Sequence, residues 1–338
     1  MAIEIGAVKR RVGLAMSGGG FRAAAFHLGV MRKLEALGLL DKIDLLSCVS
    51  GGSIAGAFVA ANWSKADKLD RLDTYLRTRS IAVSSVLGGA LDLFETRLEK
   101  LAGTYDRDLF HDATLKDLAG GPRVYLNSTN LATGNMFFFV AGGGLPEEMG
   151  EHELGVVPAP DFRVSRAVAA SSAFPPVFPP LRLGSDTYQH ASTVEYVTLT
   201  DGGVYDNMGV NPLLRVARNA LDYVIVSDGG KPFAMDDRPT DSGTIVLKES
   251  LGIMMEQIRG LEFDRLQHRY LARLGPKPIW FSIDSKAGEV QSGDAAFASA
   301  ISTNLKRLAD DEMNVLARHG SGLVEARIRR YAPELLTH

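Results

Sequence analysis

The pattern of hydrophobic and polar positions predicts alternating strands and helices in the first part of the chain. Residues 12–16 form a short apolar run that ends at a glycine-rich turn, as a buried strand does. Apolar residues then recur at helical spacing over 26–37, and Gly38 is suited to end that helix. A second apolar run at 44–49 turns at Ser50 into another helix. This order is typical of a layered α/β fold.

The rest of the chain continues with more strands and helices. Residues 64–118 are expected to be mainly helical, and residues 229–246, rich in glycine, proline and aspartate, predict a mobile loop. The other predicted elements are strands at 124–127, 136–140, 197–200, 223–227 and 278–283, and helices at 163–170, 251–273 and 295–318. The loop at 229–246 is the one plausible domain boundary, but a strand follows it and no internal repeat is found. We therefore expect a single domain over residues 1–338.

Composition narrows the classes of protein to which this chain can belong. Of its 338 residues, 46% are hydrophobic and 23% are charged, which is ordinary globular composition with enough residues for a large core. The formal net charge of -3 gives no sign of the basic excess typical of nucleic-acid-binding proteins, so no nucleic-acid partner is expected. The single cysteine, Cys48, excludes an internal disulfide framework.

The sequence predicts neither a signal peptide nor a transmembrane helix. The first residues lack the basic segment and apolar run of a secretory signal. No stretch approaches the ~20 apolar residues that cross a bilayer. We expect a cytoplasmic or peripheral membrane location.

A candidate nucleophile lies at the turn after the second predicted strand. The segment Cys48-Val49-Ser50-Gly51-Gly52 joins a strand to a helix, which is the context of a nucleophile elbow that exposes a serine oxygen beside a helix N-terminus. The match to G-x-S-x-G is partial because cysteine replaces the first glycine, although cysteine is small enough for close packing of helix on strand. A glycine turn without catalytic function is the alternative interpretation of Ser50.

A second glycine-rich turn, at Gly18, Gly19 and Gly20, follows the first predicted strand. Its unhindered N–H groups at a helix start are suited to bind the oxyanion of a tetrahedral intermediate, and Arg22 is a candidate to support that oxygen or a substrate phosphate. The alternative is a dinucleotide-binding loop, because the same residues with Ala23 satisfy G-x-G-x-x-A. That alternative requires an acidic residue at the end of the next strand, where this sequence has a serine.

A carboxylate at a strand end is the candidate general base. Asp201 ends the strand predicted at 197–200, and burial there would raise its pKa and make it a better base near neutral pH. A structural aspartate that caps the turn is the alternative, and Asp228, with the same Asp-Gly-Gly pattern, is the main rival. A Ser–Asp–His triad would use His319, although this histidine also fits the end of the helix at 295–318.

Four segments taken in order resemble the patatin-like phospholipases, a family that shares its Ser–Asp dyad with the cytosolic phospholipases A2. They match the family's glycine-rich oxyanion loop, serine elbow, Ala-Ser/proline segment and Asp-Gly-Gly/Ala motif. The segments are 17–22 (SGGGFR), 50–53 (SGGS), 170–179 (ASSAFPPVFP) and 201–203 (DGG). The resemblance covers residues 12–212, about three fifths of the chain.

The resemblance implies a three-layer α/β/α fold with a central, mostly parallel mixed sheet. It also implies that Ser50 attacks an ester carbonyl while Asp201 accepts its proton, that Gly18, Gly19 and Gly20 supply oxyanion donors, and that water releases a fatty acid from an acyl-enzyme. The expected substrates are phospholipids or lysophospholipids, with no cofactor and no metal. Two alternatives stay open, namely acyl transfer to an alcohol or thiol by the same dyad and a nucleotide-binding regulatory module that uses the loop at Gly18 to Gly20.

A lipid substrate implies transient contact with a membrane surface, and three segments are candidates for that contact. Residues 81–94 are apolar and predict either a lid or a core helix, and the three phenylalanines at 137–139 fit either a buried strand or a lipid-contacting loop. Arg265, Arg269 and Arg273 recur every four residues and suit either anionic headgroups or a solvated helix face.

Overall fold

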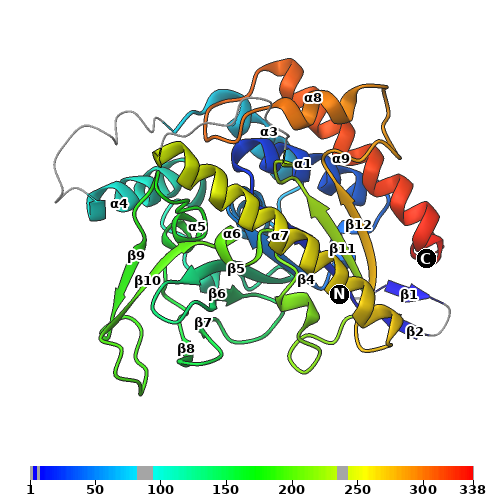
Figure 1. Cartoon of the computed structure of the whole chain (residues 1–338). Coiled ribbons are helices and arrows are strands. Elements are labelled where there is room, and N and C mark those ends of the chain that lie inside the picture. Colours follow the sequence, from blue (N-terminus) through cyan, green and yellow to red (C-terminus); the bar gives the residue numbers. More distant parts are fainter. Residues whose placement is uncertain (1–2, 6–7, 82–93, 234–242, 338) are drawn as a thin grey trace.

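The computed structural model describes residues 3–5, 8–81, 94–233 and 243–337 (Figure 1). Within these residues, ten strands form one sheet in the order β12-β11-β3-β4-β5-β6-β7-β8, while β10 pairs with β5 and β9 pairs with β10. The strands are β1 Ile3–Ile5, β2 Val8–Arg10, β3 Val12–Met16, β4 Leu45–Val49, β5 Arg123–Asn130, β6 Met136–Ala141, β7 Glu148–Glu151, β8 Gly155–Pro158, β9 Leu181–Gly184, β10 Tyr196–Asp201, β11 Tyr223–Asp228 and β12 Lys277–Ser282. Strands β12, β11, β3, β4 and β5 run parallel, and the remaining pairings of the sheet are antiparallel. Strands β1 and β2 form a separate hairpin.

Helices flank the sheet, and the longest of them, α7, runs across the front of the molecule in Figure 1. The helices are α1 Gly20–Ala36, α2 Gly51–Ala61, α3 Lys68–Thr78, α4 Phe94–Tyr105, α5 Val164–Ser171, α6 Gly203–Asp206, α7 Gly243–Leu271, α8 Asp294–Ala300 and α9 Asp310–Tyr331. Shorter helical segments lie at Leu40–Lys42, Asp106–Phe110, Leu115–Leu118, Pro212–Leu214 and Pro333–Leu336.

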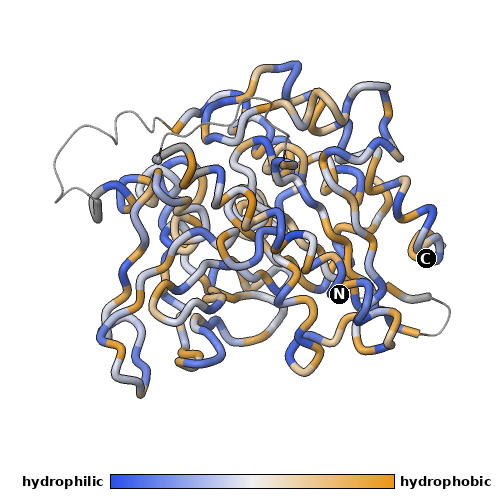
Figure 2. Tube along the Cα trace, in the orientation of Figure 1, coloured by the Kyte–Doolittle hydropathy of each residue, from blue (hydrophilic) through white to orange (hydrophobic). Residues whose placement is uncertain are grey.

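The strand residues divide between two hydrophobic clusters, one on each face of the sheet. Leu14 and Met16 of β3 belong to the larger cluster and Ala15 between them to the smaller one, as the two-residue period of a strand requires. Residues of α1, α2 and α9 complete the larger cluster, while Leu266 of α7 and Leu213 belong to the smaller one. Figure 2 shows apolar (orange) and polar (blue) segments alternating along the chain. The expected α/β fold, a mixed sheet with helices on both faces, is confirmed.

Two of the predicted elements are wrong in their extent. The helix predicted at 295–318 is interrupted, because α8 ends at Ala300 and α9 starts at Asp310 and continues to Tyr331. The intervening residues form an irregular segment with bends, and some of their carbonyl groups accept hydrogen bonds from other segments, such as that of Leu305 from the N–H of Ile81. The loop predicted at 229–246 ends earlier than expected because α7 begins at Gly243, and residues 234–242 lie outside the described residues.

Candidate active site

The ends of two strands meet along one edge of β5. Strand β4 runs parallel to β5, and its last residue, Val49, pairs with Asn127. Strand β10 approaches from the opposite direction on the same edge, and its last residue, Asp201, pairs with Ser128. Since neighbouring residues of a strand are about 3.3 Å apart, this head-to-head arrangement brings the turn at Ser50 next to Asp201.

Ser50 occupies a sharp turn between β4 and α2. Its φ of 50° and ψ of -114° lie in the left-handed half of backbone space, which costs energy for a residue other than glycine and persists only where the surroundings enforce it. The turn is crowded: a Cβ on Gly51 would lie 2.1 Å from the carbonyl oxygen of Gly20, and a Cβ on Gly52 would lie 2.2 Å from that of Met16. The predicted strand–turn–helix context is therefore present.

Cys48 explains how the turn tolerates the departure from G-x-S-x-G. Its side chain is fully buried and faces α2, where a Cβ on Gly56 would lie 2.4 Å from the Cys48 Sγ. In G-x-S-x-G the small residue that lets helix and strand pack closely is a glycine on the strand. Here the strand has Cys48, and Gly56 on the helix leaves the space for its side chain. Burial raises the pKa of the Cys48 thiol, which keeps it in the neutral, unreactive form.

Asp201 is a buried carboxylate with one oxygen held and one left open. Its side chain is 2% exposed, and Oδ1 accepts a hydrogen bond of 2.7 Å from the N–H of Gly203. Burial raises the pKa of Asp201 to about 7, while the Gly203 N–H and the nearby Ser50 hydroxyl lower it part of the way. The Ser50 hydroxyl is thus close to the carboxylate, yet Oδ2 is buried with no hydrogen-bond partner in the described part of the chain.

Ser171, at the end of α5, joins the two turns. Its Oγ accepts a hydrogen bond of 3.0 Å from the N–H of Ser50 and donates one of 2.6 Å to the carbonyl of Asn127. Its own carbonyl accepts a hydrogen bond from the N–H of Gly202, which directly follows Asp201. One residue therefore fixes the positions of both the serine and the aspartate turns.

The three glycines predicted to supply oxyanion donors differ in how their N–H groups are used. The N–H of Gly18 donates to the carbonyl of Asn207 at 3.0 Å, so it is occupied in this conformation. Gly19 and Gly20 lie at the N-cap and first position of α1, where N–H groups have no acceptor within the helix. A Cβ on Gly18 would lie 3.2 Å from the Ser50 Cβ, so the loop runs directly beside the serine.

The comparisons with known proteins identify the family. A family model described as patatin-like phospholipase matches residues 14–214, more than half of the chain. The chain belongs to the patatin-like phospholipase family. No curated protein matches the patatin-like chain at the sequence level.

Solved structures similar to this patatin-like chain include human GIVD cytosolic phospholipase A2. The likeness has a TM-score of 0.61 at 15% identity and covers 97% of this chain and 60% of that chain. A structure of the human enzyme with methyl gamma-linolenyl fluorophosphonate and terbium chloride matches with a TM-score of 0.58 at 14% identity, over 97% of this chain and 59% of that one. The chain thus spans about three fifths of the length of these structures, and at this identity the likeness shows the fold.

Arg22 of the patatin-like loop is buried, and its guanidinium faces main-chain carbonyl groups. It donates hydrogen bonds of 2.9 Å to Ile301 and 3.0 Å to Gly229, and burial lowers its pKa to about 10. These bonds tie the start of α1 to the C-terminal part of the chain. Contact of Arg22 with an oxyanion or a phosphate stays a prediction.

The rival base, Asp228, is engaged in an ion pair. It ends β11, two strands from β4, and its Oδ2 accepts a hydrogen bond of 2.6 Å from Nε of Arg259 in α7. The N–H of Gly230 donates to its Oδ1. Both oxygens of Asp228 are thus engaged, whereas Oδ2 of Asp201 has no hydrogen-bond partner in the described part of the chain.

The triad histidine, His319, lies within α9 instead of ending a helix as expected. It is fully buried against Phe26, and its Nε2 is 2.8 Å from the carbonyl of Ile283, which follows the edge strand β12. Strand β12 is three strands from β4 in the sheet. The second histidine of this region, His27, is also buried, between the Ser17 carbonyl and the Ser227 hydroxyl, and burial lowers its pKa to about 4.

Sequence analysis missed the part played by Asn207. A Cβ added to Gly18, Gly203 or Gly230 would approach its side-chain amide to within 2.4, 2.6 and 2.9 Å. Its amide therefore fills the space between the oxyanion loop, the Asp201 turn and the turn after β11. No local pattern in the sequence indicates this role, because only the fold brings the three glycines around one amide.

Other expectations have mixed outcomes. The three phenylalanines at 137–139 are buried in β6, as the strand interpretation predicts, whereas the lid candidate at 81–94 falls largely on residues 82–93, outside the described residues. Arg265 forms an ion pair with Glu262, and Arg269 donates to the carbonyl of Leu274.

Two features of the described residues concern metal ions and membranes. Across these residues, no group of three or more histidine, cysteine, aspartate or glutamate side chains is arranged to hold a metal ion. No helix in the same part of the chain has the length and apolar character to span a bilayer.

Proposed function

We propose that the protein is a lipid acyl hydrolase that cleaves fatty-acyl esters of phospholipids or lysophospholipids with Ser50 as nucleophile and Asp201 as general base. Membership in the patatin-like phospholipase family supports lipid acyl hydrolase activity. The observation that carries the finer assignment is the head-to-head approach of β4 and β10 on β5, which sets a strained serine beside a buried, partly open carboxylate.

In the proposed first half-reaction, Asp201 Oδ2 takes the proton of the Ser50 hydroxyl as Oγ attacks the ester carbonyl carbon. The carbonyl electrons move onto oxygen, and the N–H groups of Gly19 and Gly20 donate to the resulting oxyanion. Collapse of the tetrahedral intermediate breaks the ester C–O bond, and the leaving alcohol takes the proton from Asp201. The acyl group is then esterified to Ser50.

In the second half-reaction, a water molecule gives a proton to Asp201 and attacks the acyl carbon. The intermediate expels Ser50 Oγ, which recovers the proton from Asp201, and a fatty acid is released. A pKa near 7 suits both steps, because Asp201 must accept a proton and then return it at similar pH. An alcohol or thiol in place of this water would give acyl transfer by the same dyad.

We further propose that α7 contacts the lipid surface from which the substrate is taken. Leu247, Met254 and Leu261 follow one another at seven-residue intervals, a spacing that keeps them on one side of the helix, and each is more than 60% exposed. The same helix packs against α6, the short helix that follows Asp201, and its Arg259 pairs with Asp228 at the end of β11. An exposed apolar stripe next to the site fits the approach of a lipid bilayer.

Labelling with a fluorophosphonate followed by peptide mapping tests the assignment of Ser50 and Asp201. We expect the label on Ser50, no label and no fatty-acid release in Ser50→Ala, and loss of at least about a thousandfold in rate in Asp201→Asn. His319→Gln, which keeps an N–H for the carbonyl of Ile283, should retain most activity. A label elsewhere, or equal loss in the histidine variant, would contradict the dyad.

Supplying an acceptor alcohol separates hydrolysis from transfer. A hydrolase releases free fatty acid at the same rate with and without the acceptor. An acyltransferase forms the new ester and releases little free acid when the acceptor is absent.

A further inference from the structure

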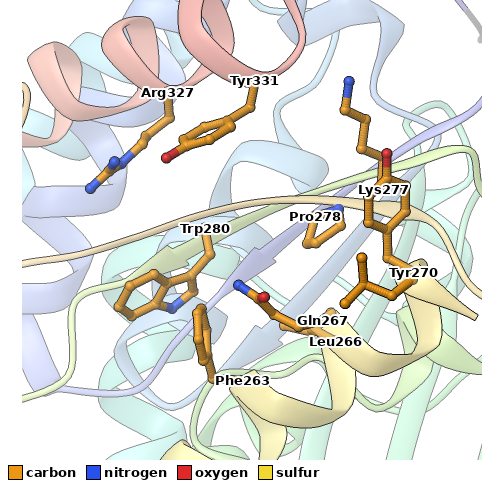
Figure 3. Close-up of a pocket in the computed structure, with 10 residues that line it drawn as sticks. Phe263, Leu266, Gln267, Tyr270, Lys277, Pro278, Trp280, Arg327 and Tyr331 are labelled. Carbon is orange, nitrogen blue, oxygen red and sulfur yellow. The ribbon is translucent and has the colours of Figure 1, made fainter.

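A cavity of about 380 Å³ lies between the C-terminal half of α7, strand β12 and the C-terminal part of α9. Figure 3 shows Phe263 and Gln267 extending from α7, Trp280 from β12, and Arg327 and Tyr331 from α9. The volume falls within the range of small-molecule sites.

The cavity is separate from the Ser50 site. Its strand, β12, is the edge of the sheet, three strands from β4. The residues that β12 contributes to the lining include Lys277, at the amino end of that strand. Ser50, by contrast, follows the carboxyl end of β4. A ligand here would not touch the proposed dyad.

The walls of the cavity are mainly apolar and are not shaped for a flat ring. Phe263 and Trp280 already pack on each other, with ring centroids 4.8 Å apart and planes inclined by 59°, and Leu266 lies beside them. A planar ligand is held best between parallel faces, which these tilted rings do not offer. A flexible acyl chain adapts to such a surface.

The charged side chains that line the cavity are both cations. No aspartate or glutamate is among the ten lining residues, while Lys277 and Arg327 are. The indole Nε1 of Trp280 and the Nε of Arg327 are buried without a hydrogen-bond partner in the described part of the chain. Buried donors are normally satisfied, so these two nitrogens show that the walls around the cavity hold donors without acceptors.

We propose that this cavity binds a single-chain amphiphile with an anionic head, its acyl chain along Phe263, Leu266 and Trp280 and its head at Arg327. Lys277 is the weaker candidate for the head, because Glu334 already lies 3.2 Å from its Nζ. Fatty-acid anions and anionic lysophospholipids share this chemistry, and both are products of the proposed function. The choice of ligand rests on that function, but binding itself requires no turnover.

Trp280 provides the measurement, because the chain has two tryptophans and the other is Trp63. In a Ser50→Ala, Trp63→Phe protein, a fatty acid brominated along its chain should quench Trp280 fluorescence saturably. Arg327→Gln should weaken binding about ten- to a hundredfold, the worth of a hydrogen bond to a charged group. Arg329→Gln, on the same helix but paired with Glu325, is the matched control and should bind as the parent does.

Competition identifies the head group. An unbrominated fatty acid or a lysophosphatidic acid that displaces the probe supports the proposal and names the source of the anion, whereas the matching fatty alcohol should compete at least about tenfold less well. The proposal is overturned if quenching does not saturate, if Arg327→Gln binds as tightly as its control, if the alcohol competes equally, or if a planar aromatic carboxylate displaces the probe as well as the fatty acid does. Because the protein lacks Ser50, none of these outcomes depends on whether Ser50 is the nucleophile.

Discussion

At the scale of single residues, the environment of Asp201 determines the chemistry that the site can perform. The carboxylate is removed from water and has one hydrogen bond to Oδ1, so its charged form is disfavoured and its pKa rises to about 7. A carboxylate with this pKa performs the task that a histidine performs in a Ser–Asp–His triad. His27, which contacts the residue before the glycine-rich loop, is buried between the Ser17 carbonyl and the Ser227 hydroxyl, and burial keeps it neutral by lowering its pKa to about 4.

The rate of fatty-acid release should follow the ionisation of Asp201. Only the carboxylate form accepts the serine proton, so kcat/KM should be constant above about pH 8 and should fall tenfold for each pH unit below about 7. A pH–rate profile with a soluble ester substrate measures this dependence. A profile that stays flat down to pH 5 would exclude Asp201, with this raised pKa, as the base.

Ser171 should act through position and not through contact with the substrate. Ser171→Ala removes the acceptor of the Ser50 N–H and the bond to the Asn127 carbonyl, so we expect kcat to fall about ten- to a hundredfold with little change in KM. Ser172→Ala is the matched control, since the Ser172 hydroxyl donates to the carbonyl of Val168 in α5, lies 3.3 Å from the Tyr105 hydroxyl and has no bond to the Ser50 turn in the described residues. Fluorophosphonate labelling rates should fall in the first variant and not in the second.

At the scale of elements, local pattern predicted the strands and helices that carry the site but not how they meet. The runs at 12–16 and 45–49 are rich in apolar residues because they form central parallel strands, β3 and β4, in which every residue is buried. The approach of β10 to β4 depends instead on pairing between residues some seventy positions apart, Asp201 and Ser128, which no local pattern encodes. The pairing of Ser50 with Asp201 was predicted from the order of the family's motifs and not from periodicity.

The elements missed by the sequence have physical reasons. Strands β7, β8 and β9 have four residues each, which is too short for a two-residue alternation to stand out. The break between α8 and α9 was missed because 301–309 contains apolar residues at helix-compatible spacing. These residues are buried through contacts with α1 and α3 and not through a helix of their own.

The exposed stripe of α7 should matter for binding to vesicles and not for catalysis. Leu247→Gln with Leu261→Gln should reduce partitioning of the Ser50→Ala protein onto phospholipid vesicles at least about tenfold, because apolar area leaves water on contact. Leu131→Gln with Leu145→Gln removes two similarly exposed leucines from other turns and should have little effect. Equal partitioning of the two double variants in co-sedimentation would exclude α7 as the membrane-contacting face.

At the scale of the whole molecule, the C-terminal third is packed onto the part that matches the family. Helix α9 crosses α1 where both carry glycines, and a Cβ on Gly29 would lie 2.0 Å from the carbonyl of Ala317, and one on Gly320 2.3 Å from that of Phe26. A Cβ on Gly20 would likewise lie 2.3 Å from the carbonyl oxygen of Asn304, in the segment between α8 and α9. The candidate oxyanion loop leads directly into α1, the helix against which α9 packs. The expectation of one domain over 1–338 stays a prediction.

Gly29→Ala should therefore destabilise the fold although alanine favours helices. The added methyl group collides with backbone, so we expect a loss of about 2 kcal/mol in the free energy of unfolding. Gly103→Ala in α4, where a Cβ meets nothing within 4 Å, is the matched control and should gain up to about 1 kcal/mol. Thermal or urea denaturation of both proteins measures the difference, and equal stability of the two variants would contradict the close crossing of α1 and α9.

The packing of Cys48 against Gly56 has a practical consequence for experiments on this protein. The only native thiol is sealed in the core in its protonated form, so maleimide and other sulfhydryl reagents should leave the folded chain unmodified. A cysteine introduced at any exposed position would then be the sole attachment point for a spin label or dye. Distances between labelled positions, and the depth of a labelled position in a membrane, could then be measured without first replacing a native cysteine.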